Sequence, residues 1–543
     1  MPMIAMPLIV LQLAASLLAA PAVARKPAPG AAAARGQLVV FISIDQLRYQ
    51  DVMLLSREFG PAGFAGLGQP GQLRYDTVVT ETAADHATLS TGSWPELHGV
   101  VANKWLEDGK ARQSIDDARC PLWGKPGDGR SSAALRAPTI GDALKVGTAG
   151  RARVVSVGNK DRVALLLAGP SADLALFWDD KSGGFVSTQC YASGPPPWVD
   201  ALNAAHPLSS FRDYVWTPSR PLEQLGRYAD LDAPDVLPLN GIGPRFPHPV
   251  GQGEVSPRLA IALRQTPAAT TLALAAALAA AESLALGDQG QSDLLLLGIA
   301  SVDGVGHQFG AHAPERIDTI LRLHDELSGF VSWLRARYGE RVAIVLSADH
   351  GITPIAAELR KLHLDVHALD REPMTGRLER ALTEKLGPLA GGYVELFEPP
   401  QLWLRRTPGE ADHQIHLAAE ALRGEPDLWR VVETARLSAS DVELAAAPSF
   451  VRHAIYPGRS SDLLLIARPL SIVKKGADGA DHGSPWNDDA LVPLFISAPG
   501  WSMRPQYRGG TVLATQVAPT LAQLLSIAPP SAAMEQPLLM REP

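Results

Sequence analysis

The chain has few cysteines and little excess charge, and a charged residue interrupts its Ala/Leu-rich stretch; each of these features excludes a class of protein. Only Cys120 and Cys190 occur in 543 residues, which excludes a disulfide-dense scaffold and a thiolate metal cluster. The net charge of −8 provides no basic surface, so we expect no nucleic-acid binding. The Ala/Leu-rich stretch 271–286 contains Glu282 and is expected to be a buried helix, so we expect no membrane span in the mature protein.

The amino-terminal segment has the pattern of a secretory signal peptide. Residues 3–24 are apolar and end in Ala-Val-Ala before Arg25, which predicts a signal peptide over 1–24 and a flexible leader over 25–35. No Lys or Arg precedes the apolar run, which leaves an uncleaved anchor as the alternative. We therefore expect an exported protein, periplasmic or secreted. That compartment permits a Cys120–Cys190 bond, but spacing alone does not decide whether it forms.

The remaining residues, 36–543, are predicted to form one α/β domain around a largely parallel sheet flanked by helices. The composition, 46% hydrophobic and 20% charged, is that of an ordinary globular protein. Two loop-rich insertions are predicted, at about 169–257, where Pro, Gly and Trp are frequent, and at about 355–460. Three helices are expected: one that begins at Thr82, one over residues 271–286 and one over residues 313–338. The runs SSDLLLIARP and ALVPLFISAP, beginning at 460 and 490, are expected to be the last core strands.

Three Val/Ile/Leu-rich runs each lead into an aspartate. These aspartates are Asp45, Asp303 and Asp349, and two have a histidine nearby, His307 and His350. Such runs are typical of buried parallel strands, whose carboxyl ends meet at one edge of the sheet where ligands bind. Taken singly, each aspartate is equally consistent with a turn or a helix cap. The three together predict a metal site at that edge.

The ligand types suffice for two metal ions. Asp303, His307 and His482 form one set, and a second set comprises Asp45, Asp349 and His350. Imidazole and carboxylate without thiolate favour zinc over magnesium. Two ions roughly 3.5–4 Å apart suit in-line displacement at phosphorus.

A nucleophile is available at the start of the predicted helix TAADHATLST. Thr82 lies at the amino-terminal end of this helix, whose positive potential favours anion binding. Read alone, Thr82 is a helix N-cap. With metal coordination its hydroxyl becomes a nucleophile, and a metal ligand as well.

These motifs together resemble the alkaline phosphatase superfamily. The segments are SIDQLR, ETAADHATLSTGSWPELHGVVANKW, DGVGHQFG, ADHG and DHGSPWNDDALVPLFI, spread from residue 43 to 496. The resemblance is to the threonine-nucleophile branch that includes nucleotide pyrophosphatases/phosphodiesterases. It implies two zinc ions per chain, bound by the two sets above with Thr82, and a phosphothreonine intermediate at Thr82. It also implies an alkaline pH optimum.

Within that branch, Asn103 and Lys160-Asp161-Arg162 resemble the phosphate-irrepressible bacterial alkaline phosphatases, which are monoesterases. Lys160 and Arg162 follow a further predicted strand, ARVVSV, and suit a phosphate dianion better than a diester. They are expected, with Asn103 and the Ala83 N–H, to hold the phosphate oxygens of small phosphate monoesters. Taken alone, Lys160 and Arg162 would form a solvated turn after the strand, but their place at the same sheet edge as the aspartates favours a functional role, whereas Asn103 could equally be a turn residue.

Two other functions remain open from the sequence. A phosphodiesterase or nucleotide pyrophosphatase would use the same metals with a pocket for the second ester group. A binding protein or inactive relative would keep the scaffold without turnover. Neither Cys120 nor Cys190 begins the Cys-x-Pro-x-Arg motif that a sulfatase reading requires.

Several histidines are expected outside the catalytic set. His86 and His98 are expected to pack or hydrogen-bond, and His312 to lie behind the ligands. The remaining ones are predicted at the surface of the second insertion: His363, His367, His413, His416 and His453.

Overall fold

The structure is a computed structural model that describes residues 36–231, 241–366, 369–438, 440–474 and 479–542. The predicted signal peptide and leader, and His367, lie outside these residues. In the described ranges, no helix combines the length and apolar character needed to cross a membrane. Cys120 and Cys190 form a disulfide, which answers the question that spacing left open.

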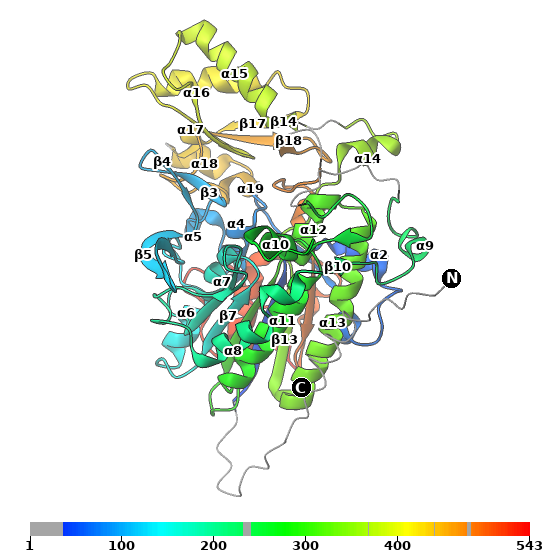
Figure 1. Cartoon of the computed structure of the whole chain (residues 1–543). Helices are drawn as coiled ribbons and strands as arrows, with labels where there is room; N and C mark the ends of the chain where they lie inside the picture. Colours follow the sequence, from blue (N-terminus) through cyan, green and yellow to red (C-terminus); the bar gives the residue numbers. More distant parts are fainter. Residues whose placement is uncertain (1–35, 232–240, 367–368, 439, 475–478, 543) are drawn as a thin grey trace, which may run out of the picture.

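A nine-stranded sheet forms the centre of the larger body (Figure 1). Five of its eight strand pairings are parallel, which confirms a largely parallel sheet. In spatial order the strands are β22 (Thr511–Leu513), β2 (Gly71–Arg74), β20 (Leu491–Ser497), β13 (Val342–Ser347), β1 (Leu38–Ile44), β12 (Asp293–Ile299), β7 (Val154–Gly158), β8 (Leu174–Asp179) and β9 (Gly184–Val186).

The middle strands are apolar because helices cover both faces of the sheet. Every residue of β1, β12 and β13 is buried. In the parallel register Ser43 of β1 lies beside Gly298 of β12 and Ser347 of β13, so the three strands end together. The helices that cover the two faces are α4 (Thr82–Thr91), α6 (Ile140–Gly147), α7 (Asp161–Ala168) and α21 (Val517–Leu525) on one side, and α11 (Ala268–Ser283), α12 (Ser301–Phe309) and α13 (Pro314–Tyr338) on the other. The flanked α/β sheet is therefore confirmed.

A smaller lobe, drawn at the top of Figure 1, has its own sheet and core. Its helices include α15 (Arg371–Leu386) and α16 (Ala411–Leu422). The strand order is β15 (Val394–Glu398), β16 (Gln401–Leu404), β18 (Leu463–Ala467) and β17 (Leu428–Glu433). The expectation that SSDLLLIARP is a strand of the central sheet is thus wrong, because this run is β18 of the smaller lobe. ALVPLFISAP is confirmed as central strand β20.

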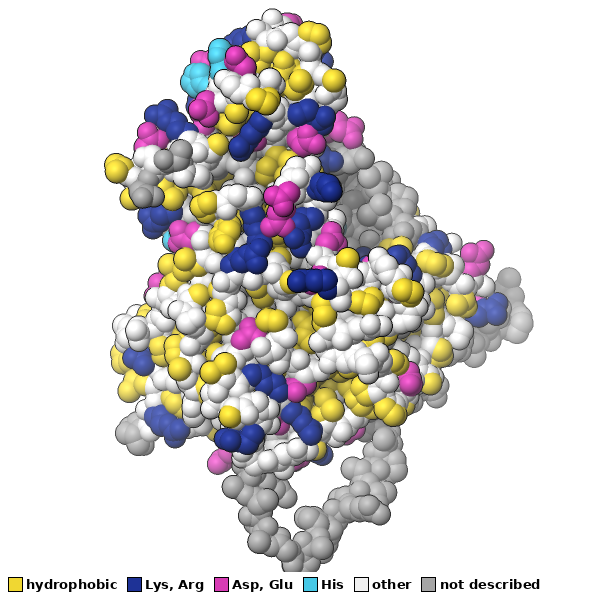
Figure 2. Space-filling model, turned by 90° about the vertical axis from the view of Figure 1, so that its left-hand side faces the viewer, with side chains coloured by type: hydrophobic (Ala, Val, Ile, Leu, Met, Phe, Trp, Pro, Cys, Tyr) yellow, Lys and Arg dark blue, Asp and Glu magenta, His cyan; other side chains and the backbone are white. Residues whose placement is uncertain are grey.

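The first predicted insertion also differs from the structure. Residues 174–179 and 184–186 are β8 and β9 of the central sheet, so the loop-rich part begins after β9. The Pro/Gly-rich remainder packs beside α13, where the Trp216 indole donates to Asp318 at 2.9 Å. Figure 2, which views the molecule from the left-hand side of Figure 1, shows Lys, Arg, Asp and Glu side chains gathered where the smaller lobe meets the body.

Candidate active site at the carboxyl edge of the sheet

The predicted ligands lie at the carboxyl edge of the central strands, below the smaller lobe. Asp45 follows the last residue of β1, and Asp349 and His350 follow β13. Asp303 and His307 do not stand at a strand end as expected. They lie on α12, four residues apart on one helix face, and their side chains are 3.1 Å apart.

The first cluster consists of Asp45, Asp349 and His350, all buried, with potential ligand atoms close enough for one cation. The His350 Nε2 lies 3.5 Å from Asp45 Oδ1 and 3.3 Å from Asp349 Oδ2. Among the described residues, the two Asp45 oxygens and Asp349 Oδ2 form no hydrogen bond, although Lys160 and His86 lie within ion-pair distance of Asp45 Oδ2 and Asp349 Oδ2 respectively. Burial and neighbouring carboxylates raise the pKa of Asp45 to about 7, and burial raises the pKa of Asp349 to about 7. A cation would relieve this charge crowding.

The second cluster centres on His482, which the loop after the smaller lobe brings to the edge. Two ligand groupings share it: Asp303 with His350 and His482, and His307 with Asp481 and His482. His482 stacks on His350 with ring centroids 3.5 Å apart, and its Nδ1 lies 2.7 Å from the Thr80 carbonyl oxygen. The two predicted sets are therefore adjacent parts of one constellation.

Asp481 was not singled out from the sequence. Its Oδ1 lies 3.6 Å from His307 Nδ1. Burial lowers the pKa of His307, but the carboxylates of Asp303 and Asp481 outweigh it and raise that pKa to about 9. The sequence could have indicated Asp481 as a candidate ligand, because it directly precedes the predicted ligand His482.

Thr82 lies at the junction of the two clusters. It is the first residue of α4, and its Oγ1 is 3.4 Å from His350 Nε2. Glu81 is the residue before the helix and has no side-chain capping bond, so the N-cap interpretation of Thr82 is wrong. The helix ends at Thr91 and is followed by Gly92, whose φ of 71° is one that glycine adopts without strain.

Asn103 is tied to the start of α4. Its Oδ1 accepts from the Ala83 N–H at 3.0 Å, and its own backbone N–H donates to Glu81 Oε2 at 2.7 Å. The Ala83 N–H, expected to face phosphate, is therefore engaged by Asn103 here. Burial raises the pKa of Glu81 to about 8.

Lys160 and Arg162 stand at the start of α7 and differ in their contacts. The Lys160 ammonium lies 2.6 Å from Asp45 Oδ2 and 2.6 Å from Asp303 Oδ2, between the two clusters. Burial lowers the pKa of Lys160, but these two carboxylates raise it above its ordinary value. The half-buried Arg162 guanidinium has no hydrogen bond or ion pair within the described ranges. Arg162 is thus available to an anion.

The histidines set aside from the sequence fall into three environments. His86 is buried, with Nδ1 3.3 Å from Asp349 Oδ2, and His98 is buried beside Thr88, as expected. His312 contacts Glu358 at 3.3 Å. His453 was predicted at the surface, which is wrong. It is buried and stacks on Trp94, because α19 (Ser449–Arg452) packs against the body.

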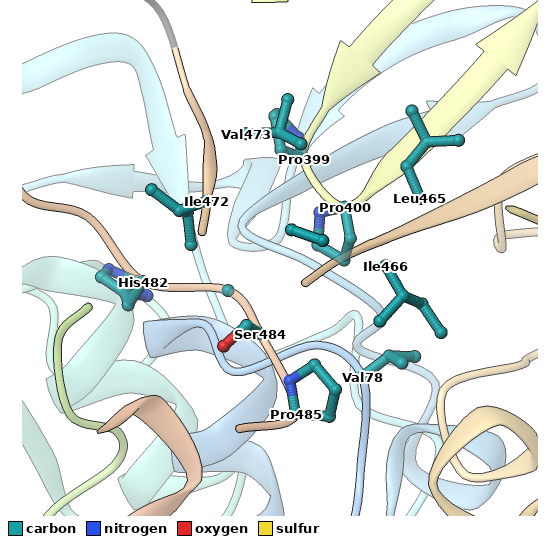
Figure 3. A pocket seen from close by; sticks show the side chains of 12 residues that line it. Val78, Pro399, Pro400, Leu465, Ile466, Ile472, Val473, His482, Ser484 and Pro485 are labelled. Carbon is teal, nitrogen blue, oxygen red and sulfur yellow. The ribbon is translucent and has the colours of Figure 1, made fainter. Parts of the chain in front are cut away.

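A cavity adjoins the site on the side of the smaller lobe (Figure 3). Its walls include Val78, Pro399, Pro400, Ile472 and His482. Pro399 and Pro400 come from the turn between β15 and β16, and His482 from the loop below. The lining is mainly apolar beside the second cluster.

The chain is similar to known proteins over most of its length. Residues 39–485 match the family described as type I phosphodiesterase / nucleotide pyrophosphatase. The chain is 30% identical to alkaline phosphatase PhoK from Sphingomonas sp, over 92% of this chain and 90% of that protein. It is 27% identical to alkaline phosphatase PafA from Elizabethkingia meningoseptica, over 93% and 94%.

Solved structures agree with the sequence comparisons. The crystal structure of wild-type alkaline phosphatase PafA superposes with a TM-score of 0.82 at 26% identity, covering 94% of this chain and 99% of that one. A murine ectonucleotide pyrophosphatase/phosphodiesterase, at 15% identity and a TM-score of 0.51, shares the fold.

Proposed function

The chain belongs to the type I phosphodiesterase / nucleotide pyrophosphatase family of the alkaline phosphatase superfamily, and we propose that it hydrolyses phosphate monoesters to an alcohol and inorganic phosphate. The observation that carries the proposal is the position of Thr82. Its hydroxyl contacts His350, which belongs to two adjacent groups of potential metal ligands. Relatives named alkaline phosphatases match over most of their length.

The donor set suits two zinc ions. Asp45 and Asp349 have buried oxygens without hydrogen bonds, and the surrounding donors are imidazole and carboxylate. Asp45, Asp349 and His350, with Thr82, would hold one ion, and the other would be held by Asp303, His307 and His482. When bound, the ions lower the pKa of hydroxyl groups and stabilise negative charge on the reacting oxygens.

Thr82 supplies the nucleophile in the proposed reaction. Its oxygen bonds to phosphorus as the ester P–O bond breaks, and the proton that the Thr82 hydroxyl loses is balanced by the proton that the leaving alcohol gains from solvent. Water then cleaves the phosphothreonine, which releases phosphate and restores the hydroxyl. The amino-terminal end of α4 favours the negative charge that develops there.

Arg162, Lys160 and Asn103 are proposed to bind the non-bridging phosphate oxygens. The unpaired Arg162 guanidinium can donate two parallel hydrogen bonds to a phosphate dianion. Lys160 lies between the two clusters, and Asn103 is fixed at the start of α4. A diester presents less charge to these groups.

The test compares kcat/KM for p-nitrophenyl phosphate and bis-p-nitrophenyl phosphate in the zinc-loaded protein. We expect a strong monoester preference that falls in Arg162→Ala and not in Arg151→Ala, an exposed arginine used as a control. If Arg162→Ala lowered kcat/KM equally for both substrates, Arg162 would not distinguish the phosphate dianion from the diester.

A phosphodiesterase is the second candidate, favoured by the description of the matched family as type I phosphodiesterase / nucleotide pyrophosphatase. The same measurement decides, because a diester preference would assign the enzyme to this function.

Export is also proposed, from the apolar segment 3–24. Fractionation of expressing cells, with mass spectrometry of the amino terminus, tests it. A protein retained inside the cell with residues 1–24 intact would contradict export.

A further inference from the structure

Gln46 connects the two candidate metal clusters. It follows Asp45 in the turn after β1 and is fully buried. Its backbone N–H donates to Asp349 Oδ1 at 3.1 Å, and its side-chain Nε2 donates to Asp303 Oδ1 at 3.1 Å. One residue thus holds a carboxylate from each cluster.

The backbone at Gln46 is held in an unfavourable conformation. Its φ is 69°, in the left-handed region that residues other than glycine rarely adopt. Such a conformation is unfavourable and persists only where surrounding contacts enforce it. In this conformation the N–H and the side-chain amide point to two different carboxylates.

A buried charged network enforces that conformation. The Arg316 guanidinium donates to the Gln46 carbonyl oxygen at 2.8 Å and to Asp51 at 2.7 Å. Arg48 also binds Asp51, at 2.6 Å. Arg316 is fully buried on α13, so the network links the turn after β1 to that long helix.

The neighbouring helix leaves space for the Gln46 side chain. At Gly306 of α12 a Cβ atom would stand 1.8 Å from Gln46 Oε1, so only glycine permits this placement. Gly306 lies between Asp303 and His307 on the same helix. The side chain therefore packs directly under the second cluster.

We propose that Gln46 is a positioning residue that orients Asp303 in one metal cluster and Asp349 in the other through its two amide groups. This inference rests on the proposed metal assignment. Hydrogen bonds behind metal ligands fix the ligand orientation, and losing one typically lowers metal affinity about 10- to 100-fold.

The test measures zinc affinity by competition with a chelator, with zinc counted by mass spectrometry, for the parent and Gln46→Met. We expect the affinity of one zinc to fall about 10- to 100-fold in Gln46→Met. Glycine adopts positive φ freely, so Gln46→Gly should fold and should show the same loss of zinc affinity. It serves as the test variant if Gln46→Met does not fold. Gln414→Met, which removes a buried glutamine amide bonded to Thr407, is the matched control and should bind zinc as the parent does.

A double-mutant comparison locates the effect. In an Asp303→Asn background, adding Gln46→Met should change zinc affinity by less than about twofold, because the interaction partner is already altered. The inference is overturned if Gln46→Met and Gln46→Gly bind zinc as tightly as the parent, or if the loss persists in Asp303→Asn. A parent that binds no zinc would overturn the proposed function and this inference together.

Discussion

Thr82 combines three local properties that a nucleophile needs. It starts a fully buried helix, it contacts His350, and the helix N-terminus favours an anion at its hydroxyl. Other threonines of the same helix lack the second property. Thr91, for example, donates its hydroxyl to the Ala87 carbonyl oxygen.

We expect Thr82→Ala to lose kcat for p-nitrophenyl phosphate by on the order of 10³-fold or more, because no covalent intermediate can form. Its zinc content, measured by mass spectrometry, should retain the ion at the second cluster. Thr91→Ala is the control and should keep kcat within about threefold. Turnover by Thr82→Ala near the parent rate would rule out Thr82 as the nucleophile.

Among the elements, the turn after β1, the start of α2 (Tyr49–Leu55) and α13 are joined by buried ions. Asp51 pairs with Arg48 and Arg316, and none of the three is exposed by more than 5%. Burial raises the pKa of Asp51, but Arg316 and Arg48 outweigh it and hold the pKa below its ordinary value. Removing one member leaves an unpaired buried charge.

We expect Asp51→Asn to lower the free energy of unfolding at pH 7 by about 3–5 kcal/mol, measured by urea denaturation. A folded pKa below the unfolded one means that Asp51 stabilises the protein above about pH 4, and that this contribution is lost as the pH falls further. The difference between parent and variant should therefore shrink in acid. The exposed Asp412→Asn is the control, and a difference that grows in acid would contradict the sign of the pKa shift.

At the scale of the whole molecule, a disulfide constrains the fold, and the proposed metal ions would constrain it further. The Cys120–Cys190 bond closes a loop with a sequence separation of 70 residues and joins β5 (Asp116–Leu122) to the chain after β9. The proposed zinc ions would draw ligands from α12, from the 482 loop and from the residues that follow β1 and β13. The disulfide favours the folded chain over the unfolded one, and bound zinc would do the same.

Replacing both cysteines by serine should lower the free energy of unfolding by about 2–4 kcal/mol, since the unfolded chain gains conformational freedom. Chemical denaturation of the oxidised parent and of the double variant measures it. The parent treated with reductant should match the variant. Equal stability of all three would show that the bond constrains little.

Chelation of the metals should lower the unfolding temperature, because zinc binds the folded state in preference to the unfolded one. At free zinc 1,000 times above Kd the stabilisation is about 4 kcal/mol. Differential scanning calorimetry with and without chelator tests it, and zinc re-addition should restore the transition. If the unfolding temperature were the same with and without zinc, tight metal binding would be contradicted.

Local sequence patterns predict much of this molecule because strands and ligands lie close together in the chain. The apolar runs before Asp45 and Asp349 specify buried strands, and parallel strands place their carboxyl ends at one edge. The four-residue spacing of Asp303 and His307 matches one face of a helix, although the strand pattern before it suggested a turn.

Long-range packing sets the rest, since an apolar strand pattern does not say which sheet the strand joins. The sequence of β18 has the apolar pattern of a central strand, yet the strand pairs with β16 and β17 in the smaller lobe. The ion pairs of Lys160 with Asp45 and Asp303 join residues more than 100 positions apart, as does the bond from Gln46 to Asp303. Residue types and their spacing thus predict the chemistry of the site, whereas its geometry arises when the folded chain brings distant groups within hydrogen-bonding distance.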